Sequence, residues 1–439
     1  MSISQDQIAA FRAAYEADPK NELATNAVVN AGMVKALYSR NDGAVTAVHE
    51  YSDKLETEGK ITSQKASGRC WLFAGLNVMR QGMMKKYKLE SDFELSQSYM
   101  FFWDKLEKCN YFLENIIDTR DEPLDGRLVQ HLLSDPISDG GQWDMFVNLI
   151  NKYGVCPKSA YPESHQSGAS RPFCWLITVK LREYATKLRA AAAGEDLGQM
   201  KETMLAEIYR ILSITLGAPP TKFDWAFRNK DKEFTRYTDL TPLAFYKEHV
   251  PFDVNQTVSL VNDPRNEYNR LMTVDRLGNV SGGAPVRYIN VPIDVLKKYT
   301  IETIRDQEPV WFGCDVGKFL HRDTGFMDLA QFKYDLVYGT SFGMSKKERL
   351  QYGESLMTHA MVFTGVDVAD DGTLIKARVE NSWSEDLGQK GWFAATGGWL
   401  DEYLYQVVID RKRIPAELLA ILEQDPIVLP AWDPMGSLA

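Results

Sequence analysis

The sequence predicts an α+β protein in which helices come first along the chain and a sheet comes last. Two observations predict this order. Residues 61–175 carry apolar residues at helical spacing, and from Val286 onward short runs rich in β-branched and aromatic residues are bounded by Gly and Asp. At 439 residues the chain is long enough to hold more than one hydrophobic core.

The N-terminal part is expected to contain a leading segment and then a helical domain. In the leading segment, residues 1–60, a helix is predicted over residues 5–17 and Pro19 ends it. Residues 61–175 are predicted to form a largely helical domain. Its clearest helix has four apolar side chains at spacings of three and four, which places them on one face: Leu72, Leu76, Met79 and Met83.

The middle of the chain, residues 176–285, is expected to be an inserted and mostly helical module. Residues 184–193 and 200–212 are strong helix formers. Gly194 separates them, and Asp196 is a candidate N-cap for the second helix. A Gly-Ala-Pro-Pro sequence then breaks the helical pattern.

Residues 286–415 are predicted to form a β-rich domain. The expected strands are 310–316, 360–368, 374–379, 391–395 and 405–409. An Asp-Asp-Gly sequence between the second and third of these strands is a hairpin-turn signal. Residues 416–439 remain as a C-terminal arm.

The charge and the hydropathy pattern exclude several classes of protein. A formal net charge of −10 opposes sequence-independent nucleic-acid binding, because such binding depends on Lys and Arg at phosphates. No stretch approaches the roughly 20 consecutive apolar residues of a membrane-spanning helix. The N-terminus lacks the basic region and apolar run of a secretory signal. We therefore expect a cytoplasmic protein with neither a membrane nor nucleic acid as a partner.

The five cysteines are scattered, odd in number and form no CxxC pair. This pattern argues against a disulfide framework and against a structural zinc site, and it fits reduced thiols in a cytoplasm. We expect no metal and no cofactor. Four of the five are interpreted as small buried hydrophobic residues: Cys109, Cys156, Cys174 and Cys314.

Cys70 differs from the other cysteines because it stands at the expected start of a helix. Gly68 permits a tight turn into that helix. The thiolate is the nucleophilic form of cysteine, and both a helix N-terminus and a nearby imidazolium stabilise it. Cys70 is therefore the candidate nucleophile.

His359 and Asn381 are the candidate partners of this thiol. His359 stands at the entrance to the predicted strand 360–368, and Asn381 follows the next strand. Two neighbouring strands would bring the imidazole and the amide within reach of each other. A Cys-His-Asn arrangement needs a base beside the nucleophile and a third group that orients the base. A lone histidine at a strand entrance is more often a core or loop residue, so the surrounding motifs decide the assignment.

Those motifs resemble the active-site segments of the papain family. Gln64 stands six residues before Cys70 in a Gly-x-Cys-Trp sequence, and Asn381 opens an Asn-Ser-Trp sequence. The resemblance implies that the Gln64 amide and the Cys70 backbone N–H form an oxyanion hole, in which one donor is worth about 10²–10³ in rate. It also implies that Trp383 covers the hydrogen bond between His359 and Asn381.

An Asp-Gly-Gly-Gln-Trp sequence at 139–143 resembles a third segment of the same family. In that family the backbone of the Gly-Gly loop pairs with an extended substrate, as in strand addition. The resemblance therefore makes Gly140 and Gly141 substrate-binding residues. An ordinary turn is the alternative interpretation of this sequence.

The chain departs from secreted papain-like enzymes in two ways. Ser67 stands where those enzymes carry a cysteine, so their associated disulfide is missing here. His359 and Asn381 lie 289 and 311 residues after Cys70, whereas the family separation is about 130–150 residues. The inserted module between the two halves would explain the difference.

The narrower resemblance is to the bleomycin hydrolase and bacterial aminopeptidase C branch of the papain superfamily. Segments similar to that branch are 64–73, 139–144, 217–229, 311–317, 352–360 and the ending 430–439. The resemblance implies a papain-like fold, with a helical left domain and a β-rich right domain, and a homohexamer acting on peptide substrates. It also implies that the C-terminal arm lies in the active-site cleft, where the carboxylate of Ala439 holds the substrate's α-amino group and makes the enzyme an aminopeptidase.

Three other functions remain open from the sequence. A cysteine endopeptidase of the same family would use the same residues with a displaced or reshaped arm. A transglutaminase-like acyl transferase also uses cysteine, histidine and a third group. An oligomeric protein that binds nucleic acid or peptides is the alternative outside enzymes, and the acidic charge opposes its nucleic-acid form.

Overall fold

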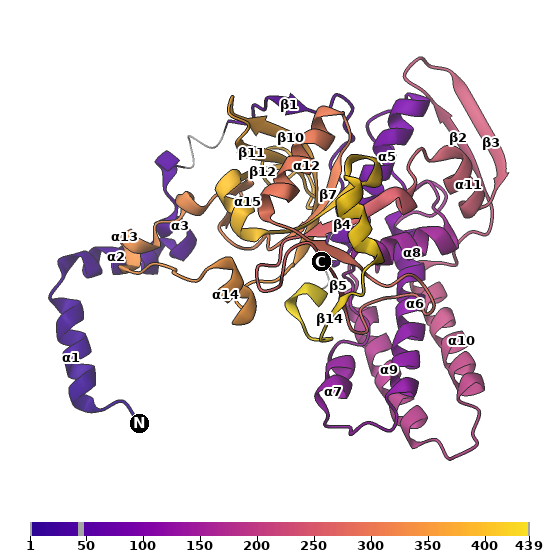
Figure 1. Ribbon diagram of the computed structural model, residues 1–439, viewed down its shortest axis with the longest axis horizontal. Coiled ribbons are helices and arrows are strands. Elements are labelled where there is room, and N and C mark those ends of the chain that lie inside the picture. Colours follow the sequence, from indigo (N-terminus) through magenta and orange to yellow (C-terminus); the bar gives the residue numbers. More distant parts are fainter. Residues whose placement is uncertain (1, 43–47, 438–439) are drawn as a thin grey trace.

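The computed structural model describes residues 2–42 and 48–437. The N-terminal end forms a segment of three helices, of which the first extends away from the rest of the molecule and the other two contact α13 (Tyr334–Tyr338) (Figure 1). This N-terminal helical segment consists of α1 (Gln5–Glu16), α2 (Pro19–Ala31) and α3 (Met33–Leu37). The predicted first helix is confirmed as α1, which begins with a capping box formed by Ser4 and Gln7. No residue of α1 or α2 is buried, so the core of the chain does not stabilise them.

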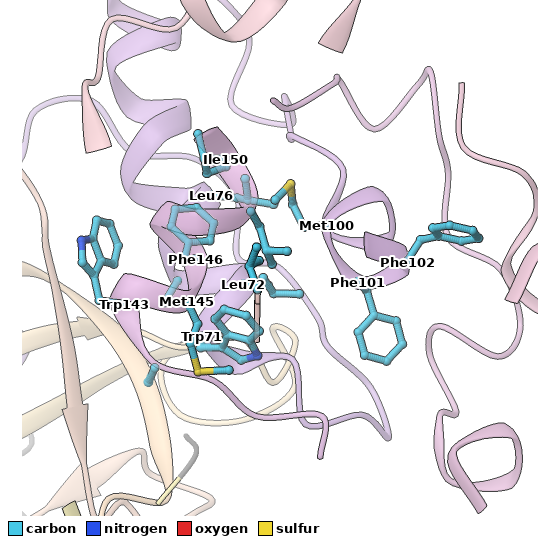
Figure 2. Packing of buried hydrophobic residues seen from close by; sticks show 14 of the residues in the cluster. Trp71, Leu72, Leu76, Met100, Phe101, Phe102, Trp143, Met145, Phe146 and Ile150 are labelled. Atoms are coloured by element: carbon cyan, nitrogen blue, oxygen red, sulfur yellow. The ribbon is translucent and has the colours of Figure 1, made fainter. Parts of the chain in front are cut away.

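The helices predicted within residues 61–175 are present. They are α5 (Cys70–Tyr87), α6 (Gln97–Asp118), α7 (Arg127–Ser134) and α8 (Trp143–Tyr153). In α5 the predicted apolar face is buried in a large core, where Leu72 and Leu76 lie near Phe146 of α8 (Figure 2). Fully burying such a side chain contributes roughly 1.5–3 kcal/mol, so this packing holds the start of α5 in place.

The segment 176–285 is only partly helical. The two predicted helices are confirmed as α9 (Arg171–Ala190) and α10 (Leu197–Leu216), and the Asp196 side chain caps α10 as predicted. The rest of the segment differs from the prediction. It contains a hairpin of β2 (Phe223–Arg228) and β3 (Phe234–Leu240), the short helix α11 (Pro242–His249), and two strands of the large sheet, β4 (Thr257–Val261) and β5 (Arg270–Val274).

The expectation of a mostly helical module is therefore wrong after residue 220. β4 and β5 are short and mostly buried, and periodicity alone does not separate such runs from a buried helix. β2 and β3 pair only with each other, whereas β4 pairs with β13 (Leu404–Asp410) in the large sheet. The middle of the chain thus contributes to the same sheet as the C-terminal part.

The five strands predicted in the C-terminal part are confirmed. They are β7 (Val310–Cys314), β10 (His359–Val368), β11 (Leu374–Glu380), β12 (Trp392–Thr396) and β13. In the described part of the chain the sheet has 12 strands, and β7, β10, β11 and β12 are consecutive neighbours within it. β10 is antiparallel to both β7 and β11, with His359 opposite Cys314 of β7.

Further elements cover or extend this sheet, whereas α13 packs against α2 and α3. α12 (Ile293–Arg305) packs on β13 and β10. The other helices are α13 (Tyr334–Tyr338), α14 (Lys346–Gln351), α15 (Gly397–Tyr403) and α16 (Ala416–Leu419). The other strands are β1 (Asp53–Lys54), β6 (Tyr288–Asn290), β8 (Leu320–His321), β9 (Phe326–Met327) and β14 (Ile427–Leu429). Across residues 2–42 and 48–437, no helix combines the length and apolar character needed to cross a lipid bilayer.

The C-terminal arm turns back toward the body of the molecule. Its strand β14 runs parallel to β5, and a short 3₁₀ turn follows. Asp433 in that turn forms an ion pair with Arg265, at 2.7 and 3.1 Å between nitrogen and oxygen atoms. The Tyr288 hydroxyl donates to the Met435 carbonyl at 3.2 Å. Two contacts from the sheet side thus fix the arm.

Candidate active site

A cleft of about 660 Å³ lies between the helices that follow Cys70 and the edge of the sheet where β10 begins. Four of the predicted site residues line it: Gln64, Cys70, Gly140 and His359. These residues come from parts of the chain almost 300 residues apart. The fold therefore brings both halves of the predicted constellation into one cleft.

Cys70 is the first residue of α5, as the sequence predicts. The preceding residue, Arg69, is fully buried and binds Glu163 through both guanidinium nitrogens, at 3.0 and 2.8 Å. Burial raises the pKa of the Cys70 thiol to about 11, although the backbone N–H groups of Ala360, Trp71 and Cys70 itself act in the opposite direction. The buried thiol therefore needs a base beside it to become a nucleophile.

His359 is the first residue of β10 and Asn381 directly follows β11. His359 Nε2 lies 2.9 Å from Asn381 Oδ1. With Nε2–H donating to this oxygen, Nδ1 is the nitrogen left to accept a proton. Burial lowers the pKa of His359 to about 4, and the bond to Asn381 opposes that shift. The Trp383 ring lies over the imidazole, with 4.8 Å between ring centroids.

Gln64 is buried beside Cys70, and both functional atoms of its amide are held. Gln64 Nε2 donates to the Ser67 carbonyl at 2.5 Å, and Gln64 Oε1 accepts from the Ser382 hydroxyl at 2.6 Å. An amide nitrogen carries two hydrogens, so one N–H remains for a ligand in the cleft. Ser382 was not among the predicted site residues. Its place inside the Asn-Ser-Trp motif was the signal that pointed to it.

The two glycines of the predicted substrate loop take different positions. Gly140 lines the cleft, and its carbonyl accepts a hydrogen bond of 2.5 Å from Lys108 Nζ. Gly141 packs on the Trp71 ring, where an added Cβ would lie 2.6 Å from the ring atoms. No larger residue fits at Gly141 without displacing the tryptophan beside the thiol.

The C-terminal arm contacts the substrate loop and the segment before His359. Gln142 Nε2 donates to the Ser437 carbonyl at 2.5 Å, and the Ser437 hydroxyl donates to the Met357 carbonyl at 2.7 Å. Ser437 therefore joins the substrate loop to the segment that leads into His359. Ala439, which the resemblance assigns to the substrate's amino group, lies outside the described residues.

Comparison with known proteins gives the chain its family. The model of the Peptidase C1-like family matches residues 2–436. This chain belongs to that family. The predicted class of papain-like cysteine peptidases is thereby confirmed.

Relatives of this Peptidase C1-like chain match along its whole length. Bleomycin hydrolase of Rattus norvegicus is 48% identical over 451 residues, which cover 100% of this chain and 99% of the relative. Aminopeptidase C of Listeria monocytogenes is 46% identical over 437 residues, which cover 99% of this chain and 98% of the relative. The crystal structure of pepw from Lactobacillus rhamnosis has a TM-score of 0.97 at 46% identity, covering 100% and 99% of the two chains. The predicted fold and the predicted branch of the family are confirmed.

Proposed function

We propose that this chain is a cysteine aminopeptidase that removes N-terminal residues from peptides through an acyl-enzyme. One observation carries the proposal: Cys70 and His359 line a single cleft, and Ser437 of the C-terminal arm binds the Met357 carbonyl, two residues before His359. The full-length similarity to proteins named aminopeptidase C and bleomycin hydrolase supports it.

In the proposed reaction, Cys70 gives its proton to His359 Nδ1 and the thiolate attacks the scissile carbonyl. Burial disfavours the Cys70 thiolate or the His359 imidazolium when only one of them is charged. The two ions form together, and their attraction stabilises the pair. Gln64 Nε2 and the Cys70 backbone N–H donate to the oxyanion. His359 then returns the proton to the leaving amine, which departs as the C–N bond breaks.

Hydrolysis of the acyl-enzyme uses the same residues. His359 takes a proton from a water molecule, and the resulting hydroxide attacks the thioester carbonyl. The C–S bond breaks, the thiol recovers its proton from His359, and the N-terminal residue leaves as a free amino acid. Asn381 keeps the imidazole ring in one orientation through both halves of the reaction.

The aminopeptidase character is assigned to the last residues of the arm. Ser437 binds the substrate loop and the segment that leads into His359. In the proposal, the carboxylate at the end of the arm attracts the α-ammonium of a peptide and blocks a longer N-terminal extension. The carboxylate of Ala439 is the proposed ligand of that ammonium.

The proposed enzyme is a cytoplasmic homohexamer. The five cysteines are free thiols, which suits a reducing compartment. The N-terminal helical segment exposes large apolar side chains, among them Ile8, Phe11 and Tyr15 of α1 and Leu23 and Val29 of α2. Exposed apolar surface of this kind marks an interface, and the resemblance to the bleomycin hydrolase branch supports six copies.

The test compares one peptide with a free and with an acetylated N-terminus, each incubated with wild type and with Cys70→Ala. Mass spectrometry of the products identifies the bonds that are cut. We expect stepwise loss of N-terminal residues from the free peptide only, and no cleavage by the variant. Equal internal cleavage of both peptides would make the enzyme an endopeptidase, and cleavage by Cys70→Ala would overturn the assigned nucleophile.

A further inference from the structure

Two lysines of α6 lie beneath the cleft instead of at the surface. The side chains of Lys105 and Lys108 are 0% and 6% exposed. Each ammonium faces a carboxylate, with 2.6 Å between Lys105 Nζ and Asp139 Oδ1 and 2.8 Å between Lys108 Nζ and Asp104 Oδ2. Burying ionised groups is costly even when they are paired, and the proposed reaction leaves these four without a role.

Both ammonium groups hold the backbone of the substrate loop. The Ser138 carbonyl accepts hydrogen bonds from Lys105 Nζ at 2.8 Å and from Lys108 Nζ at 2.9 Å. Lys108 Nζ also donates to the Gly140 carbonyl at 2.5 Å. The Lys108 ammonium thus binds two carbonyls of the loop while it faces the Asp104 carboxylate. Charge-assisted hydrogen bonds from α6 therefore hold the backbone of the substrate loop in place.

Asp139 joins this loop to the turn that presents the nucleophile. Asp139 Oδ2 accepts from the Gly68 backbone N–H at 3.0 Å, and the Asp139 carbonyl accepts from Trp71 Nε1 at 2.8 Å. An added Cβ on Gly68 would lie 2.8 Å from Asp139 Cβ, so the two segments touch. Residues on both sides of Cys70 thus depend on one aspartate, and Lys105 holds that aspartate in place.

In the Lys105–Asp139 pair, each charged group stabilises the ionised form of the other. Burial alone would raise the pKa of Asp139, but the Lys105 ammonium outweighs it and holds that pKa well below its usual range. Burial alone would lower the pKa of Lys105, and the Asp139 carboxylate reverses that shift. The pair stays ionised across the whole range in which a cysteine peptidase works.

We propose that Lys105 and Lys108 are positioning residues for the peptidase reaction, holding the Gly140–Gly141 loop at a fixed place relative to Cys70. The inference rests on the proposed function, because it is this loop that binds the extended substrate. A misplacement of about 1 Å at a reacting centre costs about 10²-fold in rate. The four buried charges prevent such a misplacement.

The test replaces Lys108 by methionine, which keeps most of the side-chain volume and removes the three donors. We expect kcat/KM for a peptide with a free N-terminus to fall by about 10²-fold. Alkylation of Cys70 by iodoacetamide, which needs no substrate loop, is expected to proceed at the wild-type rate. Hydrogen exchange of a fragment spanning residues 137–142 is expected to accelerate.

Lys346 provides a matched control. It is also buried, donates to two backbone carbonyls (Asp401 at 3.1 Å and Leu404 at 2.6 Å), and lies 4.8 Å from an aromatic ring centroid, compared with 5.3 Å for Lys108. Lys346 does not line the cleft. Lys346→Met is expected to leave kcat/KM and exchange of the substrate loop unchanged, although it removes a buried amine that also donates to two backbone carbonyls.

Three outcomes would overturn the proposal: wild-type kcat/KM in Lys108→Met, a loss of Cys70 alkylation equal to the loss of peptidase activity, or the same defects in Lys346→Met. If Lys108→Met does not fold, Asp104→Leu/Lys108→Met removes both charges and is judged by the same criteria. If the wild type cleaves no peptide, the proposed function fails, and the exchange measurement still decides whether the lysines order the loop.

Discussion

His359 occupies an environment that disfavours its charged form when the thiol is neutral. Because burial lowers its pKa from 6.5 to about 4, the unfolded chain binds a proton between these two pH values and the folded chain does not. The resulting stability is complete above pH 6.5 and is lost as the pH falls toward 4. A shift of this size corresponds to about 3 kcal/mol.

We therefore predict that the wild type loses more stability than His359→Gln between pH 7 and pH 4.5. Urea denaturation at the two pH values measures the difference. His49 also has a pKa lowered to about 4 by burial, but both proteins keep it, so the comparison isolates His359. Equal losses in the two proteins would contradict the burial argument.

Ser382 acts on the oxyanion through Gln64, because its hydroxyl holds the Gln64 amide oxygen. We predict that Ser382→Ala lowers kcat by about tenfold, less than the 10²–10³ expected of Gln64→Ala, with KM unchanged. Since Ser382 works only by orienting Gln64, the double variant is expected to match Gln64→Ala. Steady-state kinetics of the three variants provide the measurement. Ser384→Ala, whose hydroxyl donates to Asp386 and not to Gln64, is expected to behave as wild type, and additive effects would refute the orienting role.

At the scale of elements, the nucleophile helix is tied to the strand that carries the orienting asparagine. Arg80 of α5 and Glu380 of β11 form an ion pair of 2.6 Å, and the two side chains are 2% and 6% exposed. Glu380 directly precedes Asn381, so this pair couples the position of α5 to that of the base.

Removing one partner leaves a buried charge alone. We predict that Arg80→Met lowers the free energy of unfolding by about 3–5 kcal/mol, and that Arg80→Met/Glu380→Leu recovers most of the loss. Denaturant titration of both variants checks this. If the double variant is as unstable as the single one, the side chains contribute through packing and not through their charges.

The elements that carry the site could be predicted to within a few residues. The strand at His359 and the helix at Cys70 follow from local periodicity and from turn residues, and both begin where expected. Lys105 and Lys108 could not be foreseen, because charged residues spaced along a helix usually indicate a solvated face. Their burial depends on Asp139, which lies on a loop beyond the end of α6, and local sequence does not encode that contact.

The point in the chain where helices give way to strands also could not be predicted from local sequence. Val258 and Leu260 lie in a short buried run that suits either a strand or a helix, and only its pairing with β13 makes it a strand. The partner strand is almost 150 residues away in the sequence. Long-range pairing of this kind overrides local propensity.

At the scale of the whole molecule, the C-terminal arm is held by the ion pair between Asp433 and Arg265. We predict that Asp433→Ala loosens the arm and allows cleavage of an acetylated peptide that the wild type leaves intact. Asp425→Ala removes an exposed carboxylate of the same arm and is expected to change nothing. Mass spectrometry of the digests is the measurement. An Asp433→Ala enzyme that still requires a free N-terminus would show that the remaining contacts hold the arm.

Assembly is expected to depend on the N-terminal helical segment. Phe11 of α1 is 61% exposed, and Phe234 of β3 is 53% exposed. We predict that Phe11→Asp lowers the mass measured in solution by light scattering at micromolar concentration, because a charge at an apolar interface must be desolvated. Phe234→Asp makes the same change elsewhere on the surface and is expected to keep the wild-type mass. If only Phe234→Asp lowered the mass, the interface would lie at the hairpin.

The order in which the site residues occur along the chain affects how the protein is made. The thiol emerges from the ribosome early, whereas Asn381 follows 311 residues later and the arm comes last. At roughly 5–20 residues per second, Cys70 waits about 15 to 60 s for the base and its orienting amide. A nascent chain therefore carries no working peptidase site until these residues have been made and folded.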